Sequence, residues 1–196
     1  MKVGVLALQG CVEPHRKHLE ALKVECVELR SPTELRTCDA LILPGGESTT
    51  QLKLHHRFGF DQELPRYMKD HVVWGICAGS ILMAEDVRNP AQFSYGVFPV
   101  QAVRNAYGRQ KDSFTAEVLG APTAFIRAPQ LIPLRASVEV LASVDGNAVF
   151  IKHGHHLVSS CHPELSQAAP HPMYRVFLEM ILAQNQNRTN ELIQRT

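Results

Sequence analysis

The sequence lacks most of the features that mark secreted, membrane or nucleic-acid-binding proteins. Its five cysteines are odd in number, widely spaced and without a CxxC pair, so no disulfide framework is expected and a reducing compartment is favoured. No apolar run approaches transmembrane length, and the run after Met1 is too short for a signal peptide. The formal net charge of +1 gives no reason to propose nucleic acid or a membrane surface as a partner. We therefore expect a cytoplasmic protein.

Two further absences narrow the chemistry. The phosphate-binding pattern GxxxxGK[ST] is missing, and no pair of carboxylates suited to glycosidase chemistry is discernible. Three histidines, His153, His155 and His156, precede Cys161, but no second pair of ligands follows at a metal-binding spacing. We expect no metal site, and a solvated hairpin tip is the plainer interpretation of these histidines.

The composition is typical of one α/β domain that spans residues 1–196, with 45% hydrophobic and 20% charged residues. In the first half, apolar runs predict buried strands that alternate with helical segments. The strands are expected at 3–8, 24–29, 40–43 and in the run that ends at Gly75; the helices are expected at 14–23, after a capping box at 31–34, after a cap at 48–50, and within 61–69. This alternation predicts a parallel, doubly wound sheet.

The pattern changes in the second half, where short β-like runs dominate before a final helix at 172–193. The runs cover 97–103, 114–119, 123–127, 138–144, 148–152 and 157–161. Asp145-Gly146-Asn147 and the region around Gly154 are hairpin signals. We expect these strands to be antiparallel additions that extend the sheet.

The run at 72–76 leads into a GxCxG pattern centred on Cys77, and a short apolar segment follows. Strand, tight turn and helix form the nucleophile-elbow arrangement, here with cysteine in place of serine. A thiol at a helix N-terminus is favoured as the thiolate. A lone cysteine is more often a small buried hydrophobe, but this pattern favours a nucleophile.

A thiolate nucleophile needs a base and a residue that orients it. His162 and Glu164 lie two apart at the end of the last predicted strand, so their side chains would point to one side, and Pro163 keeps the segment out of a helix. Glu164 could orient His162 so that the second ring nitrogen faces Cys77. Any one of ten histidines is more often structural, but the pair after an elbow cysteine favours a catalytic triad.

Acyl chemistry also needs an oxyanion hole. The backbone N–H of Ala78 follows the nucleophile and is the natural first donor, and Gly46 in the loop after a neighbouring strand could supply the second. Arg104 and Arg127 could each hold a substrate carboxylate through paired hydrogen bonds, although composition alone makes both more typical of surface charges.

Taken together, these motifs resemble those of class I glutamine amidotransferases: PGGESTT at 44–50, GICAG at 75–79 and HPEL at 162–165. More closely, the chain looks like the glutaminase subunits of two-component pyridoxal 5′-phosphate synthases. The stretches that carry this closer resemblance are LQG at 8–10, RNAYGRQ at 104–110, DSF at 112–114 and FIRAP at 125–129. The likeness covers nearly the whole chain.

The resemblance implies a flavodoxin-like sheet, a triad of Cys77, His162 and Glu164, and no cofactor. It implies that glutamine is contacted by Gly46, Glu47, Ser48, Arg104, Ile126 and Arg127. Glutamine would be hydrolysed to glutamate and ammonia through a thioester. The ammonia would pass to a (β/α)8 synthase subunit in a large hetero-oligomer of vitamin B6 biosynthesis, and activity would depend on that partner.

Two other interpretations stay open at this point. The chain could be a stand-alone cysteine hydrolase of γ-glutamyl substrates on the same fold, or a non-catalytic scaffold with a degenerate site. Full activity without a synthase partner would favour the hydrolase. Uniformly slow alkylation of every cysteine, rather than one hyper-reactive thiol at Cys77, would favour the scaffold.

Overall fold

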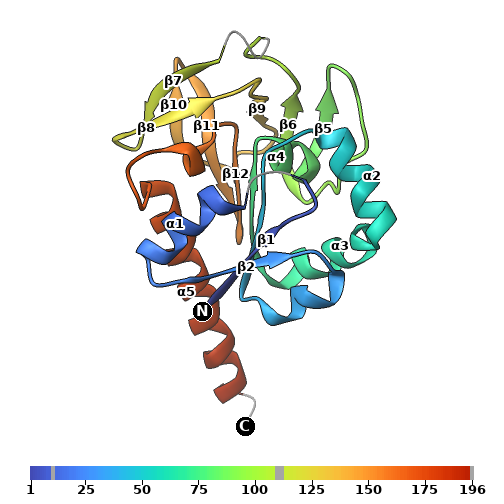
Figure 1. The fold of residues 1–196 in the computed structure, drawn as a ribbon, viewed down its shortest axis with the longest axis vertical. Coiled ribbons are helices and arrows are strands. Elements are labelled where there is room, and N and C mark those ends of the chain that lie inside the picture. The colour runs from blue at the N-terminus through green and yellow to red at the C-terminus, as the bar shows by residue number, and fades with distance from the viewer. Residues whose placement is uncertain (10–11, 109–112, 195–196) are drawn as a thin grey trace.

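The computed structural model describes residues 1–9, 12–108 and 113–194, and Figure 1 shows their arrangement. In these residues the main sheet has seven strands in the order β10-β11-β12-β4-β3-β1-β2. Its parallel strands are β1 (Lys2–Leu6), β2 (Glu25–Leu29), β3 (Ala40–Leu43), β4 (Val72–Ile76) and β12 (His156–Ser159). The predicted α/β class with a mainly parallel sheet is confirmed. Of the motifs used above, Gly10 and residues 109–112 lie outside the described residues.

Helices cover both faces of this sheet, which explains why β3 and β4 are buried along their whole lengths. On one face, α1 (Glu13–Ala21) and α5 (Pro172–Gln194) pack over a core that includes Trp74. On the other face, the core is formed with α3 (Phe60–Asp70) and the short α4 (Ala78–Met83). Figure 1 shows α1 and α5 on the side opposite to α2 (Ser48–Phe58) and α3.

The additions in the second half are only partly what the sequence predicted. β10 (Glu139–Val144) and β11 (Asn147–His153) extend the main sheet as antiparallel strands, joined at the predicted Asp145-Gly146 turn, and a second turn at Gly154 leads into β12. However, β12 returns parallel to β4. The predicted hairpins are therefore confirmed, whereas the last strand is not an antiparallel addition.

Five other strands do not join the main sheet, so the expectation that all the additions extend it is wrong. They form a three-stranded sheet and a two-stranded ribbon: β5 (Ala84–Arg88), β6 (Phe98–Val103) and β9 (Gln130–Pro133), and β7 (Phe114–Val118) with β8 (Ala121–Phe125). The sequence did not predict β5 or β9, because neither carries a long apolar run. A strand pattern also says nothing about which partner the strand pairs with.

Two helix starts differ in detail from expectation. The segment after Ser31 is a 3-10 helix (Pro32–Thr37), and the Ser31 N–H donates to Glu34 Oε2 at 2.8 Å. The N-cap of α2 is Glu47 rather than Ser48, Thr49 or Thr50, because the Glu47 carboxylate accepts the Thr49 N–H at 3.3 Å.

Within the part of the chain that the structure describes, no helix is long and apolar enough to cross a membrane.

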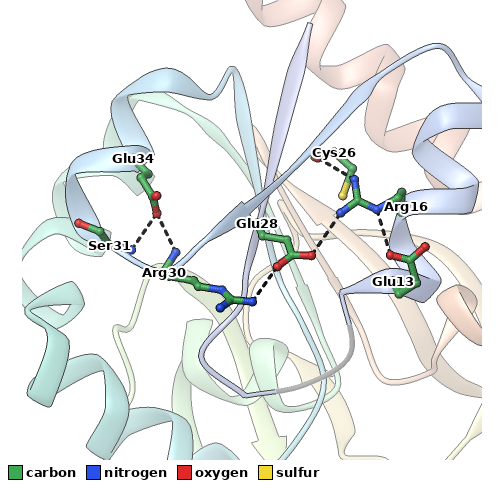
Figure 2. A network of polar contacts seen from close by, with 7 residues as sticks. All are labelled: Glu13, Arg16, Cys26, Glu28, Arg30, Ser31 and Glu34. Atoms are coloured by element: carbon green, nitrogen blue, oxygen red, sulfur yellow. Dashed lines mark hydrogen bonds and ion pairs between the residues drawn. The ribbon is translucent and has the colours of Figure 1, made fainter.

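Helix α1 is held against the edge strand β2 by a network of polar contacts (Figure 2). Arg16 donates to Glu13 at 3.0 Å, to Glu28 at 3.2 Å and to the carbonyl of Cys26 at 3.2 Å. Arg30 donates to the other carboxylate oxygen of Glu28 at 3.0 Å. The network ties the exposed side of α1 to the sheet edge and so sets how the buried side of the helix meets the rest of the molecule.

Candidate active site

Cys77 lies between β4 and α4 in the strand–turn–helix arrangement that the sequence predicted. Its backbone has φ 49° and ψ −101°, a conformation that residues other than glycine seldom adopt and that is found at strained functional turns. The Cys77 N–H donates to the Ser159 carbonyl at 2.7 Å. Ser80 Oγ lies 2.8 Å from the Gly75 carbonyl oxygen and 2.7 Å from that of Ser159. Strands β4 and β12 together therefore hold the turn.

The elbow requires glycine where α4 crosses the end of β3. A Cβ at Gly79 would overlap the carbonyl oxygen of Leu43, so no side chain fits there without moving backbone. A second close approach lies across the site, where a Cβ at Gly45 would stand 2.5 Å from Cε1 of His162. The loop after β3 is therefore packed directly against the imidazole.

His162 and Glu164 come from the segment that follows β12. The His162 N–H donates to the Ala124 carbonyl at 2.8 Å, and Nδ1 of His162 lies 2.7 Å from Oε1 of Glu164 in 3-10 helix η3 (Pro163–Leu165). The Cys77 side chain is close by, because a Cβ at Gly45 would also stand 3.6 Å from Cβ of Cys77. The structure thus brings together the three residues that the sequence proposed as a triad, from positions far apart in the chain.

Electrostatics in this group favour a charged imidazole. Burial disfavours a charge on His162, but the interactions with Cys77 and Glu164 outweigh burial and raise its pKa to about 10. Burial would likewise raise the pKa of Glu164, yet the hydrogen bond with His162 holds that pKa below its ordinary value.

A small pocket, open to solvent, lies over Cys77. Its walls come from three loops: after β3, after β6 and after β8. The lining residues are Gly46, Glu47, Ser48, Cys77, Ile81, Arg104, Asn105, Ile126 and Arg127. All six residues expected to contact glutamine are in this set, and Ala78 starts α4 beside it. Cys77 Sγ lies 4.0 Å from the Ile126 carbonyl oxygen.

The two arginines of the pocket differ in their surroundings. The Arg104 side chain is only 11% exposed, and its Nη2 lies 3.2 Å from Oε1 of Glu47. Arg127 is exposed, and its φ of 45° is positive. Arg104 is therefore not the plain surface charge that composition suggested, whereas Arg127 faces solvent at the rim.

Two glutamines that sequence reasoning passed over shape the loop after β3. Gln51 Nε2 donates to the carbonyls of Pro44 at 3.2 Å and Gly45 at 3.1 Å, and Gln9 Oε1 accepts the Glu47 N–H at 3.1 Å. Because the C=O and N–H of a trans peptide point in opposite directions, the Gly46 N–H points away from Gln51. The role of Gln51 could have been predicted from its position in the first turn of a predicted helix, because side chains there lean back over the preceding loop.

The histidines at the tip of the β11–β12 hairpin lie apart from this site. His155 Nε2 is 3.0 Å from the Met68 carbonyl oxygen, and Cys161 is fully buried in the core beyond the other end of β12. Burial raises the pKa of the Cys161 thiol, which keeps it protonated. Among the residues that the structure describes, no group of three or more histidine, cysteine, aspartate or glutamate side chains could hold a metal ion.

The structure defines an α/β protein with a cysteine at a strained turn between a central strand and a helix, and solved structures with this fold exist. One, of PurLQS from Thermotoga maritima, has a TM-score of 0.64 at 14% identity, with 96% of this chain and 98% of that chain covered. Another, a crystal structure of a glutamine amidotransferase, has a TM-score of 0.82 at 40% identity, with 91% and 98% covered. The likeness to PurLQS, at 14% identity, shows the fold alone.

Sequence comparison then identifies the family. The model of the SNO glutamine amidotransferase family matches residues 5–183, and the chain belongs to this family. Two curated relatives are named pyridoxal 5′-phosphate synthase subunit PdxT. The one from Brevibacillus brevis is 38% identical, with 92% of this chain and 97% of the relative covered. The one from Koribacter versatilis is 41% identical, with 92% and 96% covered. The resemblance drawn from the motifs is confirmed.

Proposed function

We propose that this protein hydrolyses L-glutamine to glutamate and ammonia and supplies the ammonia to a pyridoxal 5′-phosphate synthase. The observation that carries the proposal is the buried imidazole of His162, which hydrogen-bonds the Glu164 carboxylate and lies beside Cys77 in the wall of the pocket. Membership of a glutamine amidotransferase family supports the choice of substrate.

In the proposed reaction, the Cys77 thiolate attacks the side-chain amide carbon of glutamine and forms a tetrahedral oxyanion. The N–H groups of Gly46 and Ala78 stabilise this oxyanion. Imidazolium His162 gives its proton to the leaving ammonia, which leaves the acyl group on sulfur as a thioester. Neutral His162 then takes a proton from water, the resulting hydroxide cleaves the thioester, and glutamate leaves.

The pocket residues divide naturally between the two ends of the substrate. Arg104 or Arg127 holds the α-carboxylate, which selects an amino acid over a simple amide. Glu47 carries a carboxylate of the opposite sign, suited to the α-ammonium group, while Gly46, Ser48 and Ile126 complete the contacts. The ion pair between Glu47 and Arg104 supports this division because it presents both charges at one place.

The partner follows from the names of the relatives, which are subunits of a synthase. We propose that the ammonia passes to a (β/α)8 synthase subunit within a large hetero-oligomer, and that this assembly is cytoplasmic. The free thiols of Cys26, Cys38, Cys77 and Cys161 are consistent with a reducing compartment.

The test is ammonia release from glutamine, measured with and without the synthase subunit. We expect release that rises when the partner is added and that Cys77→Ala abolishes while leaving the fold intact. Cys38→Ala is the matched control, because Cys38 is also buried and free but belongs to the core on the other face of the sheet. Turnover by Cys77→Ala at the wild-type rate would overturn the mechanism.

A further inference from the structure

Behind Glu164, on the side away from the pocket, lies a buried cluster of histidines and one tyrosine. His15 and His18 come from α1, His171 directly precedes α5, and Tyr174 lies in the first turn of α5. All four are fully buried. Helix α1 packs against η3, which carries Glu164. The cluster is not part of the pocket, and the proposed reaction does not use it.

Hydrogen bonds determine the tautomer of one of these histidines. His18 Nδ1 accepts the backbone N–H of His171 at 3.1 Å, so its proton is on Nε2. Nε2 lies 3.2 Å from the backbone carbonyl of Glu164 and donates to it. Helix α1 therefore already holds the main chain of Glu164 through His18.

The tautomer of His15 follows from Tyr174. Nδ1 of His15 lies 2.6 Å from the Tyr174 hydroxyl. Burial raises the pKa of Tyr174 well above its ordinary value, so the hydroxyl keeps its proton. No other acceptor for that proton is found among the described residues, so Tyr174 donates to Nδ1 and the ring proton of His15 is on Nε2.

Two polar atoms in the cluster are left without a partner. Nε2 of His15 and Oε2 of Glu164 are both buried, and within the described residues neither has a hydrogen-bond partner. One is a donor and the other a carboxylate oxygen, and an unpaired buried group of either kind is strongly disfavoured. The attraction between them is felt by both residues, since each shifts the pKa of the other toward its charged form.

We propose that His15 is a positioning residue of the active site, whose Nε2–H holds the second carboxylate oxygen of Glu164, directly or through one buried water. The inference rests on the proposed function. In this arrangement Tyr174, His15, Glu164 and His162 form one chain of hydrogen bonds that ends at Cys77. His15 keeps the Glu164 carboxylate ionised and turned toward His162, and so favours the thiolate–imidazolium pair.

Several titratable groups act on Glu164 and His15 from the surrounding elements, and each contributes to the pH profile of the site. They are His18, Cys161, His162, His171 and Tyr174. A test therefore has to separate His15 from general effects of removing a buried histidine.

The molecule contains a matched control at His55. His55 is fully buried, its Nδ1 lies 2.8 Å from the Tyr95 hydroxyl, and its Nε2 has no partner in the described part of the chain. It does not line the pocket.

The experiment measures the rate at which iodoacetamide alkylates Cys77 as a function of pH, with the labelled peptide identified by mass spectrometry. It compares the wild type with His15→Leu, His15→Gln and His55→Leu. We expect His15→Leu to raise the midpoint of the profile by about one pH unit, a tenfold loss of reactive thiolate. His15→Gln keeps an N–H donor and should keep the midpoint, as should His55→Leu. The kcat for glutamine should fall about tenfold in His15→Leu with KM unchanged.

A midpoint that does not move in His15→Leu, or that moves equally in His55→Leu, would overturn the inference. If His15→Leu does not fold, the ring nitrogens of His15 in the wild type decide the matter by 15N NMR. The proposal requires a protonated Nε2 at pH 7, and a protonated Nδ1 contradicts it. A wild-type Cys77 that reacts no faster than Cys38 would instead refute the proposed glutaminase, so the two failures are distinguishable.

Discussion

The two buried histidine–tyrosine pairs of this protein have similar local chemistry and different neighbours. In both His15–Tyr174 and His55–Tyr95, the tyrosine hydroxyl meets Nδ1 and the histidine is fully buried. In both, burial lowers the histidine pKa to about 4. His15 has the Glu164 carboxylate as its principal charged neighbour, whereas His55 lies among aromatic rings, with Asp61 as its charged neighbour.

The two pairs therefore differ in their charged neighbours and not in burial or in the lowered histidine pKa, and we propose a role at the site for His15 alone. Both pairs stabilise the fold by the same means. His15 lies on α1, which packs on the 3-10 helix η3 that carries Glu164, whereas His55 lies on α2, which packs on α3 and α4. The following predictions alter this difference, beginning with the largest effect.

Removing the charge of Glu164 should make the two pairs equivalent. Glu164→Gln takes away the carboxylate that orients His162, and we expect glutaminase activity to fall about 10³- to 10⁴-fold, as in other triads that lose their carboxylate. In that background, adding His15→Leu should change Cys77 alkylation no more than adding His55→Leu does. A further loss specific to His15 would show that its effect does not pass through Glu164.

Acid should destabilise the protein through both pairs alike. Each histidine has a folded pKa of about 4, against about 6.5 when unfolded. Because the unfolded chain binds more protons below pH 6.5, the stability is present above that pH and is lost as the pH falls toward 4. At pH 5 each histidine should lower the free energy of unfolding by about 2 kcal/mol relative to pH 7.

Urea unfolding at pH 7 and pH 5 checks this prediction in His15→Gln and His55→Gln. Between pH 7 and pH 5, the free energy of unfolding of each variant should fall by about 2 kcal/mol less than that of the wild type. The pH dependence that comes from His162 has the opposite sign. Because the pKa of His162 is raised in the folded protein, its contribution to the free energy of unfolding is present below pH 6.5 and is lost as the pH rises through about 10. A pH dependence that is unchanged in both glutamine variants would contradict the assignment of neutral buried histidines.

The smallest effect is expected from the tyrosine hydroxyls. Tyr174→Phe and Tyr95→Phe each remove the donor to a buried Nδ1, and each should lower the free energy of unfolding by about 1 kcal/mol. Only Tyr174→Phe should also slow Cys77 alkylation, by about two- to fourfold, because the ring of His15 is then less firmly held. Equal alkylation rates in the two variants would separate Tyr174 from the site.

Much of the architecture could be predicted from local patterns. The strands at 40–43 and 72–76 are continuous apolar runs, and both are buried on two sides. The pairing of the later strands could not be predicted, because β5 to β9 leave the main sheet through contacts between distant segments. The N-cap of α2 was also misassigned, since a glutamate and three hydroxyl residues compete for that position and only the path of the loop decides between them.

The site shows the same division. The elbow at Cys77 and the pair of His162 and Glu164 could be recognised in the sequence because both are local features. The expected extended segment is wrong, however: Pro163–Leu165 form a 3-10 helix, a turn that Pro163 can begin, and it still brings Glu164 to the His162 ring. The roles of Gln51 and His15 depend on the packing of α2 and α1. His15 and His18 are three apart on one helix face, which indicates a shared surface but not what that surface covers.

The sequence by itself determined the family, the turn at Cys77 and the strand that leads into it, because each depends on residues within a few positions of one another. Only the tertiary structure decided which side chains stand behind the triad. Hydrogen bonds between α1, η3 and α5 join residues about 150 positions apart, as with His15 and Tyr174, whose separation is 159. Such contacts form only when folding brings α1, near the start of the chain, next to η3 and α5, near its end. No local sequence pattern encodes them.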